Sequence, residues 1–502
     1  MKKLARTISG VTPVAVMSRP NGCPGHCIYC PTYSATPQSY TPESPAVLRA
    51  KECDYDTGKQ VRLRLKALTE MGHPSDKIEL IVMGGTFLAQ PLDYQYQFIR
   101  DCFDALNGRE SANLEEAKKL NELADHRCVG LCLETRPDWC GPEEIARCLE
   151  FGTTRVELGV QTLDEDIYQL VRRGHGVEDV VRATTRLKEH GFKVHYHWMP
   201  GLPGSTPELD LALSERLFSD PRFRPDGLKL YPTMVVAGTE LEKWFRDGRY
   251  QPYPDEVMIN LVTEIKSMVP KYVRISRVLR DIPAKFITGG LKDSLRDVVK
   301  QRMKERGITC RCIRCREYGH RMQDNWEIDE PRLVRLDYEA SGGREILLSF
   351  EDKNETLFGL LRLRIGAQPI ASLGQEGNGN LAIIRELHVY GPEVSLHQRD
   401  PNSAQHKGLG KALLKEAERI ATEEFQAPQI VVLSGVGAKE YYRNGFGYTE
   451  QRNYLVKSLK THRSQAQDLQ ASRYPVRAVS VSHPRYQNDG QSHASPPGLS
   501  QQ

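Results

Sequence analysis

The sequence has no long apolar run. None of its stretches approaches the roughly 20 consecutive apolar residues that a membrane-spanning helix needs. The first residues, MKKLARTISGVTPVAVM, carry two lysines but break at Gly10 and Pro13, and no apolar signal-peptide core follows them. We therefore expect a soluble, cytoplasmic protein with no membrane partner.

An excess of charge of one sign is absent as well. The 69 Lys and Arg residues nearly balance the 65 Asp and Glu residues, which leaves a net charge of +4. A balance this even does not indicate a nucleic-acid partner, so only local basic patches can do so. Because 39% of the residues are hydrophobic, wholesale disorder is excluded. A length of 502 residues favours two or three domains.

The cysteine pattern is also not that of a small protein held together by disulfide bonds. Disulfide frameworks are typical of short secreted chains, whereas tight cysteine clusters in a long cytosolic chain indicate metal sites. Half of the 12 cysteines are scattered, and we expect most of these to be buried as small hydrophobic residues. The other half form two tight clusters: Cys23, Cys27 and Cys30, and Cys310, Cys312 and Cys315.

Short apolar runs alternate with helical patterns over the first 280 residues. This alternation predicts an α/β fold with a parallel sheet, either open or curled into a partial (β/α)6 barrel, whose site lies at the carboxyl ends of the strands. The predicted strands are 14–17, 78–83, 129–133, 155–160, 194–198 and 228–230, and the predicted helices include 59–71, 142–151, 177–190 and 254–269.

The pattern changes in the second half of the chain. Residues 271–325 are basic and cysteine-rich, with little apolar periodicity. Antiparallel strands are then predicted at 332–340, 344–352, 356–365 and 381–391, followed by a helix at 408–425, a strand at 429–434 and a helix at 438–444. We predict four parts: a barrel at 1–270 with an N-terminal extension, a linker at 271–325, an α+β domain at 326–459 and a disordered tail at 460–502.

The first cysteine cluster follows the first predicted strand. In RPNGCPGHCIYCP the thiols have the spacing C-x-x-x-C-x-x-C, in which three thiolates hold three irons of a [4Fe-4S] cluster and leave the fourth iron open to S-adenosylmethionine (SAM). With Tyr29 before its last cysteine, the loop resembles that of the radical SAM enzymes. A zinc knuckle, with His26 as the substitute ligand, is the alternative.

A glycine turn follows the second predicted strand. Gly84, Gly85 and Thr86 resemble the radical SAM motif for the amino group of SAM, because glycines allow backbone carbonyls to approach a ligand closely.

A second small-residue turn precedes the helix at 408–425. The spacing Q-x-x-G-x-G, beginning at Gln405, resembles the pyrophosphate loop of the GNAT acetyltransferases, where free amides at a helix N-terminus bind phosphate. In that fold the preceding strand pairs with the pantetheine arm, and a tyrosine on the late helix often faces the thioester. Here these are 386–389 and the pair Tyr441 and Tyr442, for which core packing is the alternative.

Together the two modules resemble the catalytic subunit of Elongator in its single-chain prokaryotic form. The strings that carry the resemblance are RPNGCPGHCIYCP, QSYTPESPAVLRA, KIELIVMGGTF, GLCLETRPD, RVELGVQT, CRCIRCRE, RELHVYG, QHKGLGKALLKEAERIA and SGVGAKEYYRNGFGY. The match covers about residues 10 to 459.

This resemblance implies a tRNA uridine acetyltransferase that installs a carboxymethyl-type group on carbon 5 of the wobble uridine. A SAM-derived radical would take hydrogen from the methyl of acetyl-CoA, the new carbon radical would add to uracil, and the thioester would then be hydrolysed. The family's acetyl-CoA contacts carry over onto Lys77, Glu386, Leu387, His388, Val389, Leu409, Gly410, Lys411 and Tyr442. The pyrophosphate turn adds Gln405 and Gly408 to the acetyl-CoA site, and the candidates for catalysis are Tyr441, Tyr442 and Glu386.

The linker offers three thiolates within six residues. Zinc usually takes four ligands, so one is missing, with His320 as the nearest candidate and a second iron–sulfur cluster as the alternative. Basic residues surround the thiols, and the interleaved Tyr272, Phe286 and Tyr318 predict a surface that stacks anticodon-loop bases. Arg172 and Arg173 are expected to extend it.

Two other functions remain open at this point. One is a protein lysine acetyltransferase in which the barrel is a scaffold and Glu386 is the general base. The other is a non-enzymatic RNA-binding module with a structural cluster. The predicted partners are the tRNA anticodon loop, acetyl-CoA and an electron donor that the sequence does not identify; a homodimer is an open alternative.

Overall fold

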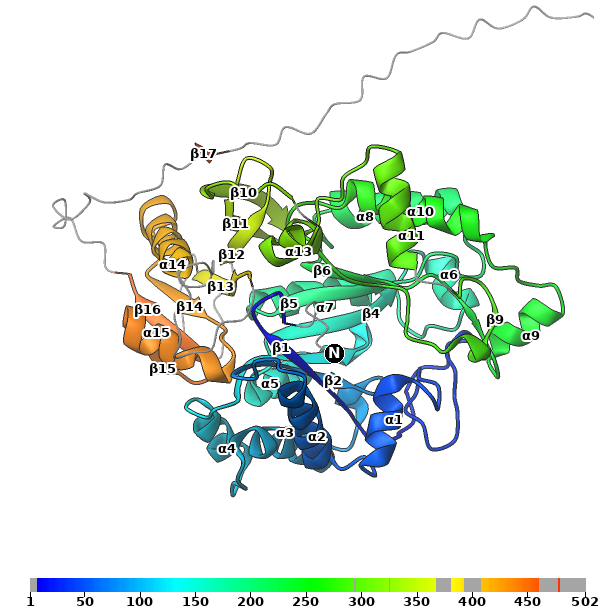
Figure 1. The fold of residues 1–502 in the computed structure, drawn as a ribbon, viewed down its shortest axis with the longest axis horizontal. Helices are drawn as coiled ribbons and strands as arrows, with labels where there is room; N and C mark the ends of the chain where they lie inside the picture. The colour runs from blue at the N-terminus through cyan, green and yellow to red at the C-terminus, as the bar shows by residue number, and fades with distance from the viewer. Residues whose placement is uncertain are drawn as a thin grey trace, which may run out of the picture.

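The computed structural model describes residues 7–292, 295–324, 326–366, 381–391, 408–459 and 477–478. Its centre is a seven-stranded sheet of parallel strands in the order β1-β2-β3-β4-β5-β6-β8 (Figure 1). The strands follow one another in chain order, as successive strand–helix–strand units require. The predicted parallel half-barrel is confirmed.

The bounds in the barrel half agree closely with the sequence patterns. The strands are β1 (Thr12–Met17), β2 (Lys77–Met83), β3 (Arg127–Thr135), β4 (Arg155–Gln161), β5 (Lys193–Trp198), β6 (Gly227–Leu230), β7 (Val235–Val236), β8 (Arg274–Val278) and β9 (Ile287–Gly289). The helices are α1 (Pro45–Glu52), α2 (Thr57–Glu70), α3 (Leu92–Asn107), α4 (Leu114–Asn121), α5 (Pro142–Phe151), α6 (Glu165–Leu170), α7 (Val177–Glu189), α8 (Pro207–Ser219), α9 (Glu240–Arg246), α10 (Asp255–Met268), α11 (Leu295–Glu305), α12 (Ile313–Arg316) and α13 (Tyr318–Gln323).

Strand β8 lies inside the segment that the sequence assigned to the linker. Its sequence RISRV buries Ile275 and Val278 against the barrel, while Arg274 and Arg277 line the cavity described below. The arginines break the apolar run, so the pattern did not predict a strand. The basic segment therefore begins with the last strand of the barrel sheet.

A second sheet carries the C-terminal half. It has the order β15-β16-β14-β13-β12-β11-β10-β17, and the predicted antiparallel ladder from β10 to β13 is present. Its elements are β10 (Arg332–Ala340), β11 (Gly343–Glu351), β12 (Leu357–Gly366), β13 (Leu381–Val389), α14 (Leu409–Arg419) with a π-turn (Ile420–Glu424), β14 (Gln429–Val432), a 3-10 turn (Val436–Ala438), α15 (Lys439–Phe446), β15 (Thr449–Gln451), β16 (Tyr454–Ser458) and β17 (Arg477–Ala478). Apart from β17, the predicted tail lies outside the described residues.

Strands β13 and β14 run parallel and then separate. They pair only from Ala382 to Ile384, and a bulge makes Arg385 the extra residue of β13 opposite β12. A bulge bends its strand and redirects a side chain. Among the described residues, the β14-facing edge of β13 beyond this bulge has no partner strand, which leaves backbone groups available to a ligand.

The redirected Arg385 joins the two halves of the chain. Its guanidinium binds both carboxylate oxygens of Asp226, just before β6, at 2.7 and 2.8 Å, and the carboxylate of Glu345 on β11 at 2.8 Å. Both Arg385 and Asp226 are fully buried. A buried pair with these hydrogen bonds holds the second sheet against the barrel in one orientation.

Breaking this pair should destabilise the whole chain. We expect Asp226→Asn to lower the free energy of unfolding by about 3–5 kcal/mol, because it leaves the Arg385 charge buried with one carboxylate fewer. Thermal and denaturant unfolding measure this. Asp247→Asn breaks an exposed pair with Arg249 and is the control, expected to show no measurable change. Equal stability of the two variants would show that the buried pair contributes nothing.

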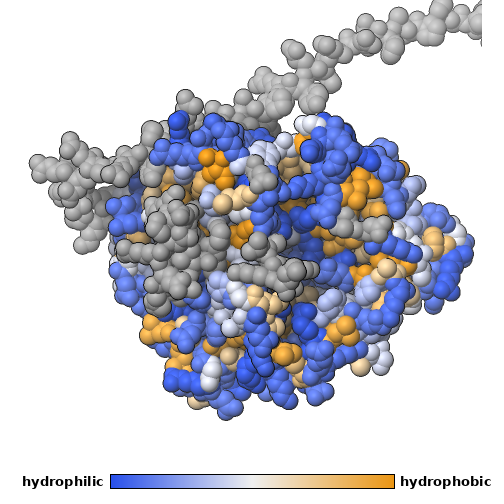
Figure 2. All heavy atoms as spheres, viewed as in Figure 1, coloured by the Kyte–Doolittle hydropathy of each residue, from blue (hydrophilic) through white to orange (hydrophobic). Residues whose placement is uncertain are grey.

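No helix of the described part of the chain is long and apolar enough to cross a membrane. On the face shown in Figure 2, apolar side chains lie in small groups among hydrophilic ones.

Candidate active site

One cavity of about 490 Å³ occupies the inside of the half-barrel. The cysteines of the first cluster and the glycine turn after β2 line one part of it. Glu386, His388 and Tyr390, from β13 and its end, line another. The cavity therefore joins the two predicted binding modules, which lie about 300 residues or more apart in the chain.

Each thiol of the first cluster has a polar neighbour from another segment. The Cys23 Sγ lies 3.6 Å from the Thr86 hydroxyl, Cys27 accepts a hydrogen bond from Arg173 at 3.4 Å, and Cys30 accepts one from the Gln38 amide at 3.3 Å. Burial raises the pKa of the Cys30 thiol to about 11. All three thiols thus line the cavity with polar neighbours beside them, an arrangement that is typical of thiolates that ligate an electron-rich group.

These thiols suit a cluster better than a single ion. Around one tetrahedral metal, sulfurs lie about 4 Å apart, which follows from metal–sulfur bonds of about 2.3 Å. Cys23, Cys27 and Cys30 are not among the described groups whose ligand atoms all fall within 4.8 Å of one another. A multi-iron cluster spreads its thiolates further, and three of them leave one iron open.

The glycine turn beside the thiols requires glycine. Gly84 and Gly85 have φ of +127° and +89°, which side-chain-bearing residues rarely adopt. A Cβ on Gly84 would lie 2.1 Å from the Ser18 hydroxyl. Gly85 and Thr86 line the cavity directly, so their backbone can approach a ligand closely.

Arg173 lies in this site and not on an RNA-binding surface. It is 6% exposed, and besides Cys27 it binds the carbonyl of Gly159 at the end of β4. The prediction that it extends a basic surface is wrong; the adjacent Arg172 is exposed and pairs with Glu240 at 2.7 Å. Two adjacent arginines look alike in the sequence, and only the fold separates them.

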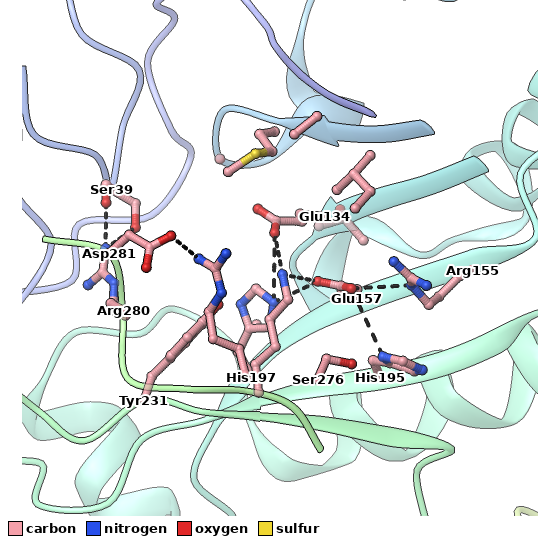
Figure 3. Close-up of a pocket in the computed structure, with 18 of the residues that line it drawn as sticks. Ser39, Glu134, Arg155, Glu157, His195, His197, Tyr231, Ser276, Arg280 and Asp281 are labelled. Atoms are coloured by element: carbon pink, nitrogen blue, oxygen red, sulfur yellow. Dashed lines mark hydrogen bonds and ion pairs between the residues drawn. The ribbon is translucent and has the colours of Figure 1, made fainter. Parts of the chain in front are cut away.

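The barrel interior holds an ionic group that the sequence analysis missed. The Lys229 ammonium lies between the carboxylates of Glu134, at 2.8 Å, and Glu157. His197 donates to Glu157 at 3.2 Å, and Figure 3 shows Glu134, Glu157 and His197 grouped in the cavity. Burial alone would raise the pKa of Glu157, but the Lys229 charge and the His197 hydrogen bond hold it well below its ordinary value. Two carboxylates and an imidazole could bind a metal ion, yet Lys229 already supplies the cation here.

The predicted acetyl-CoA residues meet where β13 and β14 separate. A Cβ on Gly410, at the start of α14, would lie 3.1 Å from the Tyr441 hydroxyl and 3.6 Å from Val389. Gly408 caps the helix with φ of +77°. Tyr441 is half-exposed, and partial burial raises its pKa to about 12, so its hydroxyl stays protonated.

The other predicted residues of this module differ in their surroundings. Tyr442 is buried in the core with Leu409, so it supports the site from behind. Leu387 packs against the same core, whereas Lys411, on α14, is exposed. Gln405 lies outside the described residues.

Glu386 is ion-paired on both carboxylate oxygens. Lys193 of β5 lies 3.2 Å from one oxygen and Arg362 of β12 lies 2.7 Å from the other. Burial alone would raise the pKa of Glu386, but these two charges hold it far below its ordinary value. Such a carboxylate has little tendency to accept a proton, which weighs against Glu386 as a general base.

Lys77 begins β2 at the edge of the barrel that meets the second sheet. It pairs in register with Arg127 of β3, and the turn Val436–Ala438 packs on that strand: a Cβ on Gly437 would lie 2.4 Å from the Arg127 Cβ. Lys77 therefore begins the strand next to the one on which this turn packs, and its contact with acetyl-CoA stays a prediction.

The second cysteine cluster is compact. The sulfurs of Cys310, Cys312 and Cys315 all lie within 4.8 Å of one another, which suits a single metal ion. His320 is not in this group, because its imidazole lies 3.0 Å from the carboxylate of Glu317.

Most basic residues around this cluster have carboxylate partners. Lys271 binds Glu351 and Glu355 at 3.0 and 2.8 Å. The prediction that Tyr272 stacks on RNA bases is wrong, because it is 5% exposed and its ring stacks on Tyr338 with centroids 4.1 Å apart. Phe286, which is partly exposed, remains available.

Two family models match the barrel half of the chain. Residues 17–213 match the model of the Radical SAM superfamily, and residues 225–305 match that of the Radical_SAM C-terminal domain. The tRNA uridine(34) acetyltransferase of Dehalococcoides mccartyi is 64% identical over 91% of this chain and 100% of its own. The human Elongator complex protein 3 is 43% identical over 91% of this chain and 86% of its own.

A solved structure agrees with these relatives. The N-terminally shortened Elp3 of the archaeon Methanocaldococcus infernus superposes with a TM-score of 0.80 at 46% identity, covering 90% of this chain and 100% of that one. The parallel half-barrel, the thiol loop and the superfamily match define a radical SAM protein, a class that implies a [4Fe-4S] cluster and SAM. Within that class, the chain belongs to the family of the tRNA uridine(34) acetyltransferases and Elongator complex protein 3.

Proposed function

We propose that the chain is a tRNA wobble-uridine acetyltransferase, which forms a carboxymethyl-type group on carbon 5 from acetyl-CoA. The supporting observation is the single cavity that both the cluster thiols and β13 line. Carbon 5 of uracil is too weakly nucleophilic for ordinary acetyl transfer, so a radical source and a thioester must act in one place. The names of the relatives agree with this proposal.

Cys23, Cys27 and Cys30 would hold the cluster, and Gly84, Gly85, Thr86 and Arg173 would hold SAM. When bound, cluster and SAM supply a carbon-centred radical. The Arg173 guanidinium has a buried Nε with no protein partner and lines the cavity, so it can bind the SAM carboxylate. The ionic group around Lys229 gives the cavity fixed charges.

The acetyl-CoA would follow the free edge of β13, with its pyrophosphate at the N-terminus of α14 and its thioester toward the cavity. The amides that follow Gly408 suit the pyrophosphate, and the protonated Tyr441 can donate to the ligand. Lys77 would contact the CoA from the barrel side.

The three thiols of the second cluster would bind zinc as a structural ion that ties the linker. The tRNA would bring its anticodon loop to the cavity, and Phe286 and the basic residues of 271–316 that stay exposed would contact it. The chain would divide into the four predicted parts, except that the barrel extends through β8 to Val278 and the linker follows it. Two such chains would form a homodimer.

A lysine acetyltransferase is the competing function. It needs a general base near the thioester, and the one that the sequence offered, Glu386, is ion-paired twice. The geometry therefore favours the tRNA reaction. Incubating reconstituted protein with a tRNA transcript, SAM, acetyl-CoA and a reductant should add mass to the wobble uridine, as nucleoside mass spectrometry would show. Acetylated lysine with unchanged uridine would contradict the proposal.

If Arg173 binds the SAM carboxylate, its replacement should weaken SAM binding selectively. Arg173→Met should weaken SAM binding about 10- to 100-fold, because it removes a charge-assisted hydrogen bond of about 1.5–3 kcal/mol. The measurement is 5′-deoxyadenosine formation against SAM concentration, with iron content determined on the same sample. Arg172→Met is the matched control, since that neighbour is exposed. Equal SAM dependence in the two variants would remove Arg173 from the SAM site.

A further inference from the structure

The proposed reaction requires a water molecule to be activated at the thioester, and Glu386 is unsuited to do so. The group that removes the proton must lie near the thioester, face the cavity and carry a free lone pair. Residues 386 and 388 share one face of β13, because side chains alternate along a strand. Both line the cavity, while Leu387 and Val389 on the other face pack against the core of the second sheet.

The hydrogen bond of His388 determines its tautomer. Its Nε2 lies 2.6 Å from the backbone carbonyl oxygen of Ser9. A carbonyl only accepts, so Nε2 carries the hydrogen and donates. In the neutral ring the lone pair is then on Nδ1. The ring also stacks on Tyr390, with centroids 4.3 Å apart, so two contacts fix its orientation.

The charges around His388 favour the neutral ring. Glu386 on the same strand attracts a proton, while Lys193 of β5 and Arg274 of β8 repel it. Glu79 of β2 is nearby and pairs with Arg155, and the Arg274 guanidinium lies 5.7 Å from the centroid of Tyr390. Burial is the largest influence and lowers the pKa of His388. The imidazole is therefore a base at neutral pH.

We propose that His388 is the general base that activates water for hydrolysis of the CoA thioester in the shared cavity. Water attacks the carbonyl carbon while Nδ1 takes its proton, the C–S bond breaks, and the CoA thiolate leaves and receives that proton. The products are a carboxylate and CoA thiol, with one proton released from the carboxylic acid, and no oxidant or reductant is consumed. This step rests on the proposed function, since it acts on the thioester which that function places along β13.

The test compares His388→Gln with unaltered protein. The glutamine amide can still donate to Ser9 but has no basic nitrogen. We expect tRNA-dependent release of CoA thiol to fall about 100-fold or more, while 5′-deoxyadenosine formation and the affinity for a thioether analogue of acetyl-CoA stay within twofold. In the unaltered protein, the rate should fall at acid pH as neutral His388 becomes protonated below the ordinary pKa range of histidine. This acid limb of the pH profile should vanish in the variant. Lys66→Gln, on the exposed face of α2, is the surface control.

A second variant, His388→Ala, distinguishes loss of the base from a folding defect in His388→Gln. Imidazole added to His388→Ala should restore part of the thiol release, and tRNA binding should persist. Wild-type release rates in His388→Gln would overturn the assignment, as would loss of thioether binding or no rescue by imidazole. If the unaltered protein releases no CoA with tRNA and SAM, the proposed function itself fails.

Discussion

Replacing Cys27 by serine should abolish uridine modification and leave tRNA binding unchanged. The thiol lines the cavity and accepts a hydrogen bond from Arg173. The three thiolates hold three irons of the cluster and leave the fourth iron open, so the loss of one thiolate prevents assembly of the cluster. Iron and sulfide content, the visible spectrum and nucleoside mass spectrometry of the anaerobically reconstituted protein measure the effect.

Cys53→Ser is the matched control for this experiment. Cys53 is buried, at 6% exposure, but it caps the C-terminus of α1 and does not line the cavity. It should keep full iron content and activity. Modification by reconstituted Cys27→Ser protein at the wild-type rate would show that the radical assignment of this loop is wrong.

Replacing Gly410 by valine should block acetyl-CoA while sparing the barrel. The new Cβ would press on the Tyr441 hydroxyl at 3.1 Å, and its methyls would enter the space between α14 and β13. Because these methyls take space that the bound ligand needs, we expect a loss of acetyl-CoA affinity of about 10- to 100-fold, or about 1.4–2.8 kcal/mol. Isothermal titration with acetyl-CoA or a thioether analogue measures it.

Gly445→Ala, in α15 of the same domain, is the control. A Cβ there meets no atom within 4 Å, so acetyl-CoA affinity should not change. Reductive SAM cleavage without tRNA should persist in both variants. Unchanged affinity in Gly410→Val would mean that the turn before α14 is structural only.

Local patterns predicted most of the fold. Helix α5 has the predicted bounds, because proline at its start and glycine after Phe151 mark both ends. The bounds of the predicted barrel strands lie within two residues of the observed ones at each end, since each strand contains a short apolar run between helical patterns. Strand β8 was not predicted, because its sequence RISRV mixes apolar residues with arginines that line the charged cavity.

The site was predictable only where ligands are close in sequence. The thiols of both clusters lie within a few residues of each other, so their spacing identified them. The partners of Glu386 come from β5 and β12, and Asp226 meets Arg385 across 159 residues. Such contacts depend on how the two sheets pack, which no local pattern encodes. For this reason Glu386 resembled a free base in the sequence, whereas its charge is already compensated in the fold.

The most direct test of the account follows hydrogen from acetyl-CoA. Reconstituted protein would be given SAM, a reductant, a tRNA transcript and acetyl-CoA with a fully deuterated methyl group. If the cavity brings the thioester to the radical site, deuterium should appear in 5′-deoxyadenosine, and the wobble uridine should carry the remaining label. Deuterium-free 5′-deoxyadenosine beside a labelled uridine, or label on lysine alone, would contradict the account.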